Sequence, residues 1–421
     1  MFRRLLSSDL LQGFAIYFGT SVLNRALPFL LLPLLTAYLG TEQYGVLSLY
    51  QAILAIALPI IGMNMSVNVT RIFFKEPREV IAQTVSAVLA VLSCSVAALT
   101  LIAVLVATFR GGIMGIPPFW LIAIPLIVGA TSVNDLGLTI LRNQQRAFNY
   151  GVLEISKTAL ELGITLYLVI QLQQGWEGRV AGIAISSIVL GSISAHRLWK
   201  SKLISRVLTR DRVNSVLRLS LPFIPHALGT ALISMSDRFF IGQLLDTSAV
   251  GIYAAGAQLG MIMSVIVTSF NRSWSPWFFK TLAINTDQAR KRIVQVTYMG
   301  FGTYLLIAVI LSAFASWLFL KMTAEEFHSG ITVIPWITFG YAMQGMYTLV
   351  FGYAVHAART HQLALITATV TVITLALNYW LISTNGIVGA AQTTFAAYAL
   401  MFAGTWWLAN SIYKMPWFTF R

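Results

Sequence analysis

The stretch HRLWKSKLISRVLTRDRVNSVLR, residues 196–218, is the longest polar segment of the chain and carries seven Lys and Arg residues. Apolar runs dominate the sequence on both sides of it, and the whole chain is 57% hydrophobic and only 10% charged. A soluble protein has roughly a quarter of its residues charged. The sequence therefore predicts an integral membrane protein that this basic segment divides near its middle.

Apolar segments long enough to cross a bilayer as helices occur on both sides of this segment. Strand-like alternation is absent, so we expect an all-α integral membrane protein. The predicted transmembrane helices are 11–38, 45–70, 80–108, 117–141, 151–172, 180–199, 217–241, 249–279, 293–319, 330–354, 361–383 and 387–412. These 12 helices give an N-terminal six-helix half (1–199), a basic cytoplasmic linker (200–216) and a C-terminal six-helix half (217–421).

The orientation follows from the positions of Lys and Arg. If the N-terminus is cytoplasmic, the segments on the outside contain only Arg110, Arg179 and Lys321, and all other basic residues of loops and termini lie inside. This asymmetry is the positive-inside rule, and it predicts that the N and C termini are both cytoplasmic. It also explains the formal net charge of +14 without nucleic acid as a partner, because no soluble domain with a basic face is visible.

The two halves show short internal similarities. LGTEQYGVL at 39–47 matches LDTSAVGIY at 245–253, with Leu, Thr and Gly in register, and RVAGIA at 179–184 resembles IVGAA at 387–391. The first pair joins helices 1 and 2 of each half, and the second pair opens the last helix of each half. We therefore expect two six-helix pseudo-repeats around a central cavity, related by an axis along the membrane normal.

Apart from Arg197 and Arg218, which belong to the basic cytoplasmic segment, eight charged residues fall inside the predicted helices. A charge at the bilayer centre costs on the order of 3 kcal/mol, so each of them should face a partner or a water-filled cavity. They are Arg25, Lys157, Arg238, Arg272, Asp135, Glu154, Glu161 and Asp237.

Three of these charges share one face of helix 5. Glu154, Lys157 and Glu161 are spaced i, i+3 and i+7. They form either a self-neutralising ladder in the bundle interior or a polar wall of the cavity, in which Lys157 contacts substrate and Glu161 exchanges a proton. Asp135 in helix 4 either pairs with Arg142 or meets another helix, and with Glu154 it is a further candidate for gating or ion coupling.

Arg25 lies near the midpoint of helix 1, too deep to reach the interface easily. Helix 1 has no acid beyond Asp9, and Pro28 and Pro33 make it bendable. A deep cation beside a bendable segment suits an anion-binding cavity, so Arg25 is the first candidate for substrate binding. Arg272 in helix 8 is either the second cation of that cavity or an interfacial arginine that reaches cytoplasmic headgroups.

Asp237 and Arg238 lie within about two turns of the periplasmic end of helix 7. Neighbours in sequence point about 100° apart around a helix, so the two need not pair with each other. One can face the cavity while the other meets a different helix. The two interpretations are a gate or latch on the outer rim and a structural ion pair between helices.

The metal-ligating residue types show no site pattern. Cys94 is the only cysteine and excludes a disulfide within the chain, and the five histidines lack metal-ligand spacing. We therefore expect no metal and no cofactor.

Three stretches, PLLTAYLGTEQYGVLSLYQAI, SDRFFIGQLLDTSAVGIYAAGAQL and LNYWLISTNGIVGAA, resemble Wzx-type flippases of O-antigen and polysaccharide repeat units. These belong to the multidrug/oligosaccharidyl-lipid/polysaccharide (MOP) exporter superfamily. The resemblance implies a multi-pass protein of the bacterial inner membrane, and not an enzyme. Its substrate would be an undecaprenyl-pyrophosphate-linked glycan, moved by alternating access, and its partners other polysaccharide-assembly proteins.

The resemblance also implies a driving force and a substrate site. Transport would be coupled to a proton or sodium gradient or to the membrane potential. Related lipid II flippases place arginines of helices 1 and 8 in a cationic cavity, and Arg25 and Arg272 match them by helix and approximate depth. A pyrophosphate accepts bidentate contacts from arginine, which agrees with this placement.

Two other functions compete with this interpretation. A cation-coupled multidrug exporter of the same superfamily should have a deep acid in or near helix 1, where this chain has Arg25. A membrane glycan-processing enzyme would need a sizeable loop with catalytic acids or histidines, and the external loops are about a dozen residues or fewer.

Overall fold

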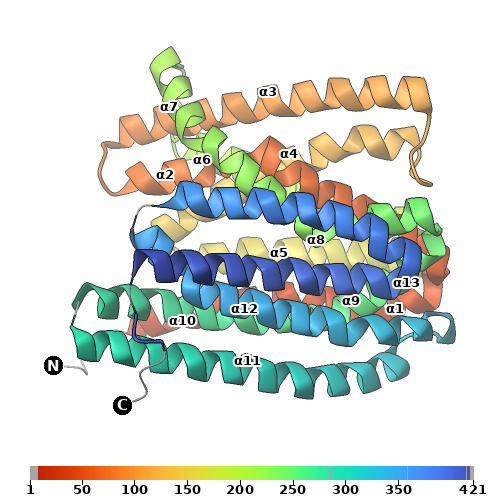
Figure 1. Ribbon diagram of the computed structural model, residues 1–421. Coiled ribbons are helices and arrows are strands. Elements are labelled where there is room, and N and C mark those ends of the chain that lie inside the picture. Colours follow the sequence, from red (N-terminus) through yellow and green to blue (C-terminus); the bar gives the residue numbers. More distant parts are fainter. Residues whose placement is uncertain (1–7, 285, 358, 414, 418–421) are drawn as a thin grey trace. The chain divides into compact units, whose positions relative to one another are not determined.

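The computed structural model describes residues 8–284, 286–357, 359–413 and 415–417, without the side chains of residues 8–18, 21–28 and 360. Helices form nearly all of this part of the chain, and it contains no strand (Figure 1). The α-helices are α1 Ser8–Gly62, α2 Ser66–Phe73, α3 Arg78–Arg110, α4 Pro118–Asn143, α5 Ala147–Leu166, α6 Gly175–Lys200, α7 Arg210–Ser220, α8 Ile224–Leu244, α9 Thr247–Gly260, α10 Ile262–Ile284, α11 Asp287–Met322, α12 Ile334–His356 and α13 Thr360–Ile412. The predicted all-α class is confirmed.

The two longest helices each bend at a glycine. Gly40 in α1 has φ 65° and Gly386 in α13 has φ 59°, values that glycine adopts at little cost because it lacks a Cβ. Each bend falls between two of the predicted transmembrane segments. The sequence thus located both bends to within a few residues.

Other predicted segments contain breaks that the sequence did not show. Between α1 and α2, Met63 and Asn64 have positive φ, and Met261 separates α9 from α10. The helix that begins as α5 ends in a π-helical turn at Tyr167–Gln171. Helices that are broken within a membrane protein are tolerated where neighbouring protein satisfies the freed backbone groups.

The predicted linker is helical in its second part. The chain has no regular structure from Lys202 to Thr209, and α7 then begins at Arg210. The amide of Asn68 in α2 donates to Ser220 Oγ at 2.8 Å, and α7 also packs on α3. Residues 210–216 therefore form part of a packed helix.

The described chain divides into two compact units. Of the described residues, unit 1 contains those in the ranges 8–31 and 49–228, and unit 2 contains those in the ranges 32–48 and 229–417. In unit 1, α4 packs on α3 and α6, and α5 packs on α6. In unit 2, α12 packs on α10, α11 and α13. Residues 32–48, the middle of α1, thus pack with helices from the second half of the sequence.

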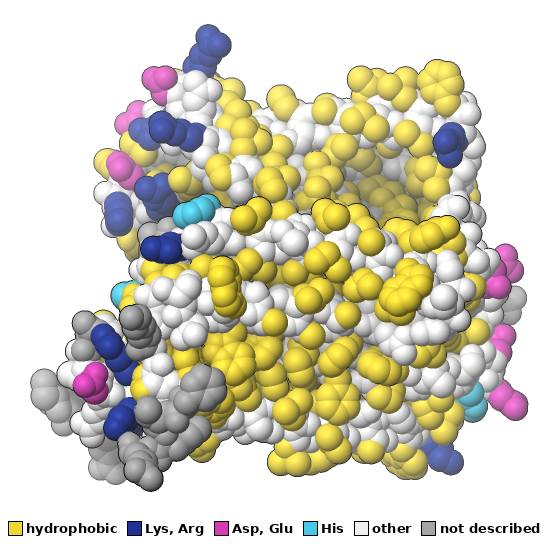
Figure 2. All heavy atoms as spheres, viewed as in Figure 1, with side chains coloured by type: hydrophobic (Ala, Val, Ile, Leu, Met, Phe, Trp, Pro, Cys, Tyr) yellow, Lys and Arg dark blue, Asp and Glu magenta, His cyan; other side chains and the backbone are white. Residues whose placement is uncertain are grey.

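The helix surfaces are those of a multi-pass membrane protein. Within the described residues, eight helices are long and apolar enough to span a bilayer. Large apolar side chains are exposed along α3 and α11, including Phe109 at 86% and Ile310 at 61%. Soluble proteins rarely expose such continuous apolar surface. Figure 2 shows these apolar flanks and, in each unit, most Lys and Arg gathered at one end of the helices.

Candidate functional site

Asp237 and Arg238, adjacent in α8, form a buried ion pair. Arg238 Nη1 lies 2.9 Å from Asp237 Oδ1, and the Arg238 backbone N–H donates to the same oxygen at 2.8 Å. The two residues are only 3% and 7% exposed. The sequence left open whether the two residues pair with each other or with other helices, and in the structure they pair with each other. The two side chains pair because the long arginine side chain folds back onto the carboxylate.

Side chains from other elements of unit 2 complete the contacts of this pair. Arg238 Nε donates to Ser48 Oγ at 3.0 Å, although the two residues are 190 positions apart. The Tyr253 hydroxyl in α9 donates to Asp237 Oδ2, and Arg238 Cζ lies 5.7 Å from the Tyr253 ring centroid. We refer to Ser48, Asp237, Arg238 and Tyr253 as the α8 network. It joins the middle of α1 to α8 and α9.

Ser234, Tyr398 and Tyr341 of unit 2 extend the contacts of the α8 network. Ser234, which accepts from Arg238 through its carbonyl at 3.2 Å, also has its hydroxyl 3.2 Å from Tyr398 Oη. Tyr341 packs on Tyr398 with ring centroids 5.4 Å apart. The ion pair is therefore neutral overall and well hydrogen-bonded, as charges removed from water require. Such a network can hold helices together, and its cation is already matched by a carboxylate.

The two related motifs of the sequence contact each other in unit 2. A Cβ on Gly45 would lie 1.9 Å from Thr247 O, and a Cβ on Gly251 would lie 1.9 Å from Thr41 O. Thr41 and Gly45 occupy the same motif positions as Thr247 and Gly251. The contact is therefore symmetric, and the backbones approach so closely that only glycine fits.

Replacing either glycine with alanine should destabilise the protein. We expect Gly45→Ala and Gly251→Ala each to lower stability by about 2 kcal/mol or more, because the added Cβ meets a backbone carbonyl that no rotamer change can move. The two effects should be non-additive, since both changes open one contact. Thermal unfolding of the detergent-solubilised chain measures this.

The matched control is Gly302→Ala in α11, where an added Cβ meets nothing within 4 Å. This change should be neutral or slightly stabilising. If alanine were tolerated at positions 45 and 251 as well as at 302, the symmetric contact would not be tight in solution.

In unit 1, Glu161 pairs with an arginine that the sequence placed elsewhere. Arg179 Nη2 lies 2.7 Å from Glu161 Oε1, and Nη1 donates to Thr165 Oγ1 at 3.1 Å. Arg179 is 6% exposed and lies in the first part of α6. Arg179 therefore lies in a helix and not in a connection, since α6 begins at Gly175, five residues before the predicted helix 180–199. Glu161 has its charge matched by a guanidinium.

A second group of charges joins α4 to α5. Asp135 interacts electrostatically with both Lys157 and Glu154, and the Tyr150 hydroxyl donates to Glu154 Oε1 at 3.3 Å. Asp135 thus meets another helix, one of the two partners that the sequence left open. This group holds two carboxylates and one ammonium, so Lys157 is accompanied by two acids.

The structure describes the side chain of only one of the two candidate substrate arginines. Arg25 lies in α1, and its side chain is outside the described residues, so its role stays a prediction. Arg272 lies in α10 with an exposed side chain, and α10 contains no Asp or Glu. Polar neighbours Asn271, Ser273 and Ser275 surround it in sequence.

Comparison with known families identifies the chain. The polysaccharide biosynthesis protein family matches residues 10–282, more than half of the sequence. The chain belongs to this family. A second family, MatE, matches residues 222–380. Protein 1 of the Lsg locus of Haemophilus influenzae is 25% identical over 302 residues, covering 70% of this chain and 71% of that protein.

Solved structures of the MOP superfamily show the fold of this polysaccharide biosynthesis protein. The lipid II flippase MurJ, in an inward closed conformation, has a TM-score of 0.72 at 13% identity, covering 95% of this chain and 87% of that chain. An inward-facing multidrug resistance MATE transporter has a TM-score of 0.70 at 14% identity, covering 93% and 96%. The predicted resemblance to MOP-type polysaccharide flippases is confirmed, and these relatives are transporters and flippases.

Sequence reasoning missed Ser48 and Tyr253 as partners of the ion pair. Both lie in the motif stretches quoted for the resemblance, but no pattern within one helix indicates a contact across 190 residues. For Arg179 a signal existed, because a deep acid such as Glu161 needs a nearby cation.

Proposed function

We propose that this protein moves undecaprenyl-pyrophosphate-linked oligosaccharide repeat units from the cytoplasmic to the periplasmic leaflet of the bacterial inner membrane. The product would serve O-antigen or another surface polysaccharide. The observation that carries the proposal is the match to the polysaccharide biosynthesis family over residues 10–282, which includes both Arg25 and Arg272. Arginine recognises pyrophosphate through paired, charge-assisted hydrogen bonds.

The proposal includes 12 transmembrane helices in two six-helix repeats, with both termini cytoplasmic. The bends at Gly40 and Gly386, each between two predicted spans, support this count. The basic residues at one end of the helices in each unit support the orientation (Figure 2). The symmetric contact between Gly45 and Gly251 supports the internal repeat.

Two polar groups are proposed to serve the transport cycle. Asp135, Glu154 and Lys157 carry one more negative than positive charge, which suits binding of a proton or sodium ion. The α8 network is proposed as a latch that holds the middle of α1 against α8 and α9 in one of two alternating states. Glu161 is a further candidate for ion coupling, and it forms an ion pair with Arg179.

The second candidate function is a cation-coupled multidrug exporter. The MatE family match over residues 222–380 favours it. Against it, helix 1 has no acid between Asp9 and Glu42, where a drug exporter needs one to attract a cation.

Cells that lack the protein distinguish the candidates. We expect completed lipid-linked repeat units to accumulate and surface glycan to disappear, with normal resistance to cationic drugs. The measurement is mass spectrometry of extracted lipid-linked oligosaccharides, together with glycan immunoblots of cells with and without a plasmid copy. Accumulation of unextended precursors would indicate a transferase, and drug sensitivity with normal glycan would indicate an exporter.

A further inference from the structure

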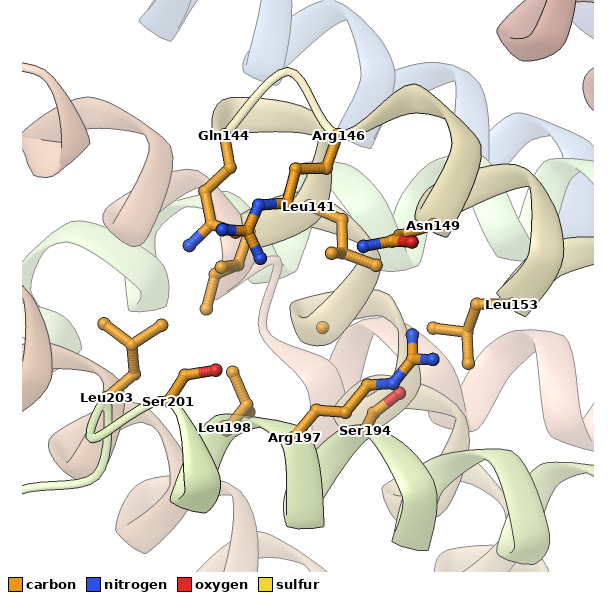
Figure 3. A pocket seen from close by; sticks show the side chains of 12 residues that line it. Leu141, Gln144, Arg146, Asn149, Leu153, Ser194, Arg197, Leu198, Ser201 and Leu203 are labelled. Atoms are coloured by element: carbon orange, nitrogen blue, oxygen red, sulfur yellow. The ribbon is translucent and has the colours of Figure 1, made fainter.

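A pocket of about 210 Å³ that is lined by both polar and apolar side chains lies within unit 1, between α4, α5 and α6. Figure 3 shows Arg146 and Gln144 on one side of it and Arg197 on the opposite side, near Asn149 and Leu153. Arg146 immediately precedes α5, and Arg197 lies in the last turn of α6. The pocket is thus formed where three helices end or begin.

The charge of this pocket is unmatched. No Asp or Glu is among the described residues that line it. Across the part of the chain that the structure describes, neither Arg146 nor Arg197 forms an ion pair. Two guanidinium groups and two amide side chains offer many hydrogen-bond donors. Such a donor set fits a phosphate group held from two sides, because arginine recognises phosphate through its planar fork.

The size of the pocket restricts the ligand further. Sites for drug-sized ligands occupy about 300–1,000 Å³. The pocket therefore suits a headgroup-sized ligand, such as a phosphate with a small substituent.

The surroundings favour a lipid as the source of this phosphate. Phe148 and Trp199, next in sequence to lining residues, are 72% and 67% exposed. Exposed aromatic side chains at helix ends mark the membrane interface. Leu141, Leu153, Leu198 and Leu203 give the pocket an apolar border. A ligand here could keep its acyl chains in the bilayer while its headgroup enters the pocket, and basic pockets between transmembrane helices bind anionic headgroups in this way.

We propose that this pocket binds the phosphodiester headgroup of an anionic phospholipid. The site lies wholly within unit 1 and differs from the arginines proposed for the glycan substrate. Arg146 and Arg197 hold the phosphate oxygens, and the side chains of Gln144 and Asn149 donate to the remaining polar atoms of the headgroup. The inference does not depend on the proposed transport function.

Native mass spectrometry of the full detergent-solubilised chain tests this proposal. We expect phosphatidylglycerol to be retained at least tenfold more strongly than phosphatidylcholine. Each change of Arg146→Gln or Arg197→Gln should weaken retention roughly tenfold, because each removes a charged hydrogen-bond donor. The matched control Arg206→Gln, in an exposed position outside the pocket, removes the same charge and should leave retention unchanged.

Further measurements distinguish a phospholipid from inorganic phosphate as the ligand, and they control for folding of the variants. Millimolar inorganic phosphate should neither displace phosphatidylglycerol nor raise the melting temperature. Equal retention by the wild type and the Arg146→Gln/Arg197→Gln double variant would overturn the proposal, and so would displacement by inorganic phosphate. The variants Arg146→Lys and Arg197→Lys, which keep the charge, should retain part of the lipid. If they retain as much lipid as the wild type, a planar bidentate contact is contradicted.

Discussion

Arg25→Ala is expected to abolish export of surface glycan, and Arg25→Lys is expected to restore only part of it. Two charge-assisted hydrogen bonds to a pyrophosphate are together worth about 3 kcal/mol or more, so their loss should reduce transport roughly a hundredfold. Lysine keeps the charge but lacks the planar fork that contacts two phosphate oxygens at once. The measurement is the surface glycan of complemented cells at matched protein levels.

Arg206→Ala provides the control for this experiment, because it removes the same charge from an exposed connection of unit 1. It should leave export unchanged. Arg272→Ala should resemble Arg25→Ala if both arginines contact the substrate. Wild-type glycan levels in a well-expressed Arg25→Ala strain would refute the role of Arg25, and full rescue by lysine would show that a point charge is sufficient.

Asp237→Ala should cause the largest loss of stability among single changes in the α8 network. It leaves the Arg238 guanidinium, 7% exposed, without its carboxylate. Removing one partner of a buried pair destabilises by about 3–5 kcal/mol. For a unit of this size we expect the melting temperature in detergent to fall by roughly 10 °C.

A double variant distinguishes the destabilisation caused by a buried unpaired charge from that caused by lost hydrogen bonds. Asp237→Asn combined with Arg238→Gln removes both charges and should be less destabilised than Asp237→Ala, because no charge stays buried alone. Tyr253→Phe, which removes only a hydroxyl donor to Asp237, should have a smaller effect still. If Asp237→Ala melted like the wild type, the ion pair would not stabilise unit 2.

Local patterns predicted much of the fold. Apolar segment lengths gave the helices, and the gaps near residues 40 and 386 fell at the glycine bends. The breaks at Met63 and Met261 were not predicted, because they lie inside long apolar runs that contain no charged residue near them. Hydropathy reports burial in lipid, and it is insensitive to how the backbone hydrogen bonds are arranged.

The candidate site was only partly predictable for a similar reason. The cost of burying charge identified Asp237, Arg238 and Glu161 as residues that need partners. It did not identify Ser48, Tyr253 or Arg179 as those partners. Partner choice depends on distances between helices, and no single helix contains that information.

By itself, then, the sequence determined the helical class and which charged residues lie inside apolar helices, because a bilayer imposes these requirements on each segment separately. Only the tertiary structure decided that Asp237 pairs with Arg238 and that residues 32–48 pack with the second half of the chain. It also placed Gly45 next to Gly251, in two related segments that are 206 positions apart in the sequence. These outcomes depend on the close packing of separate helices, which is settled by the whole set of side chains at once.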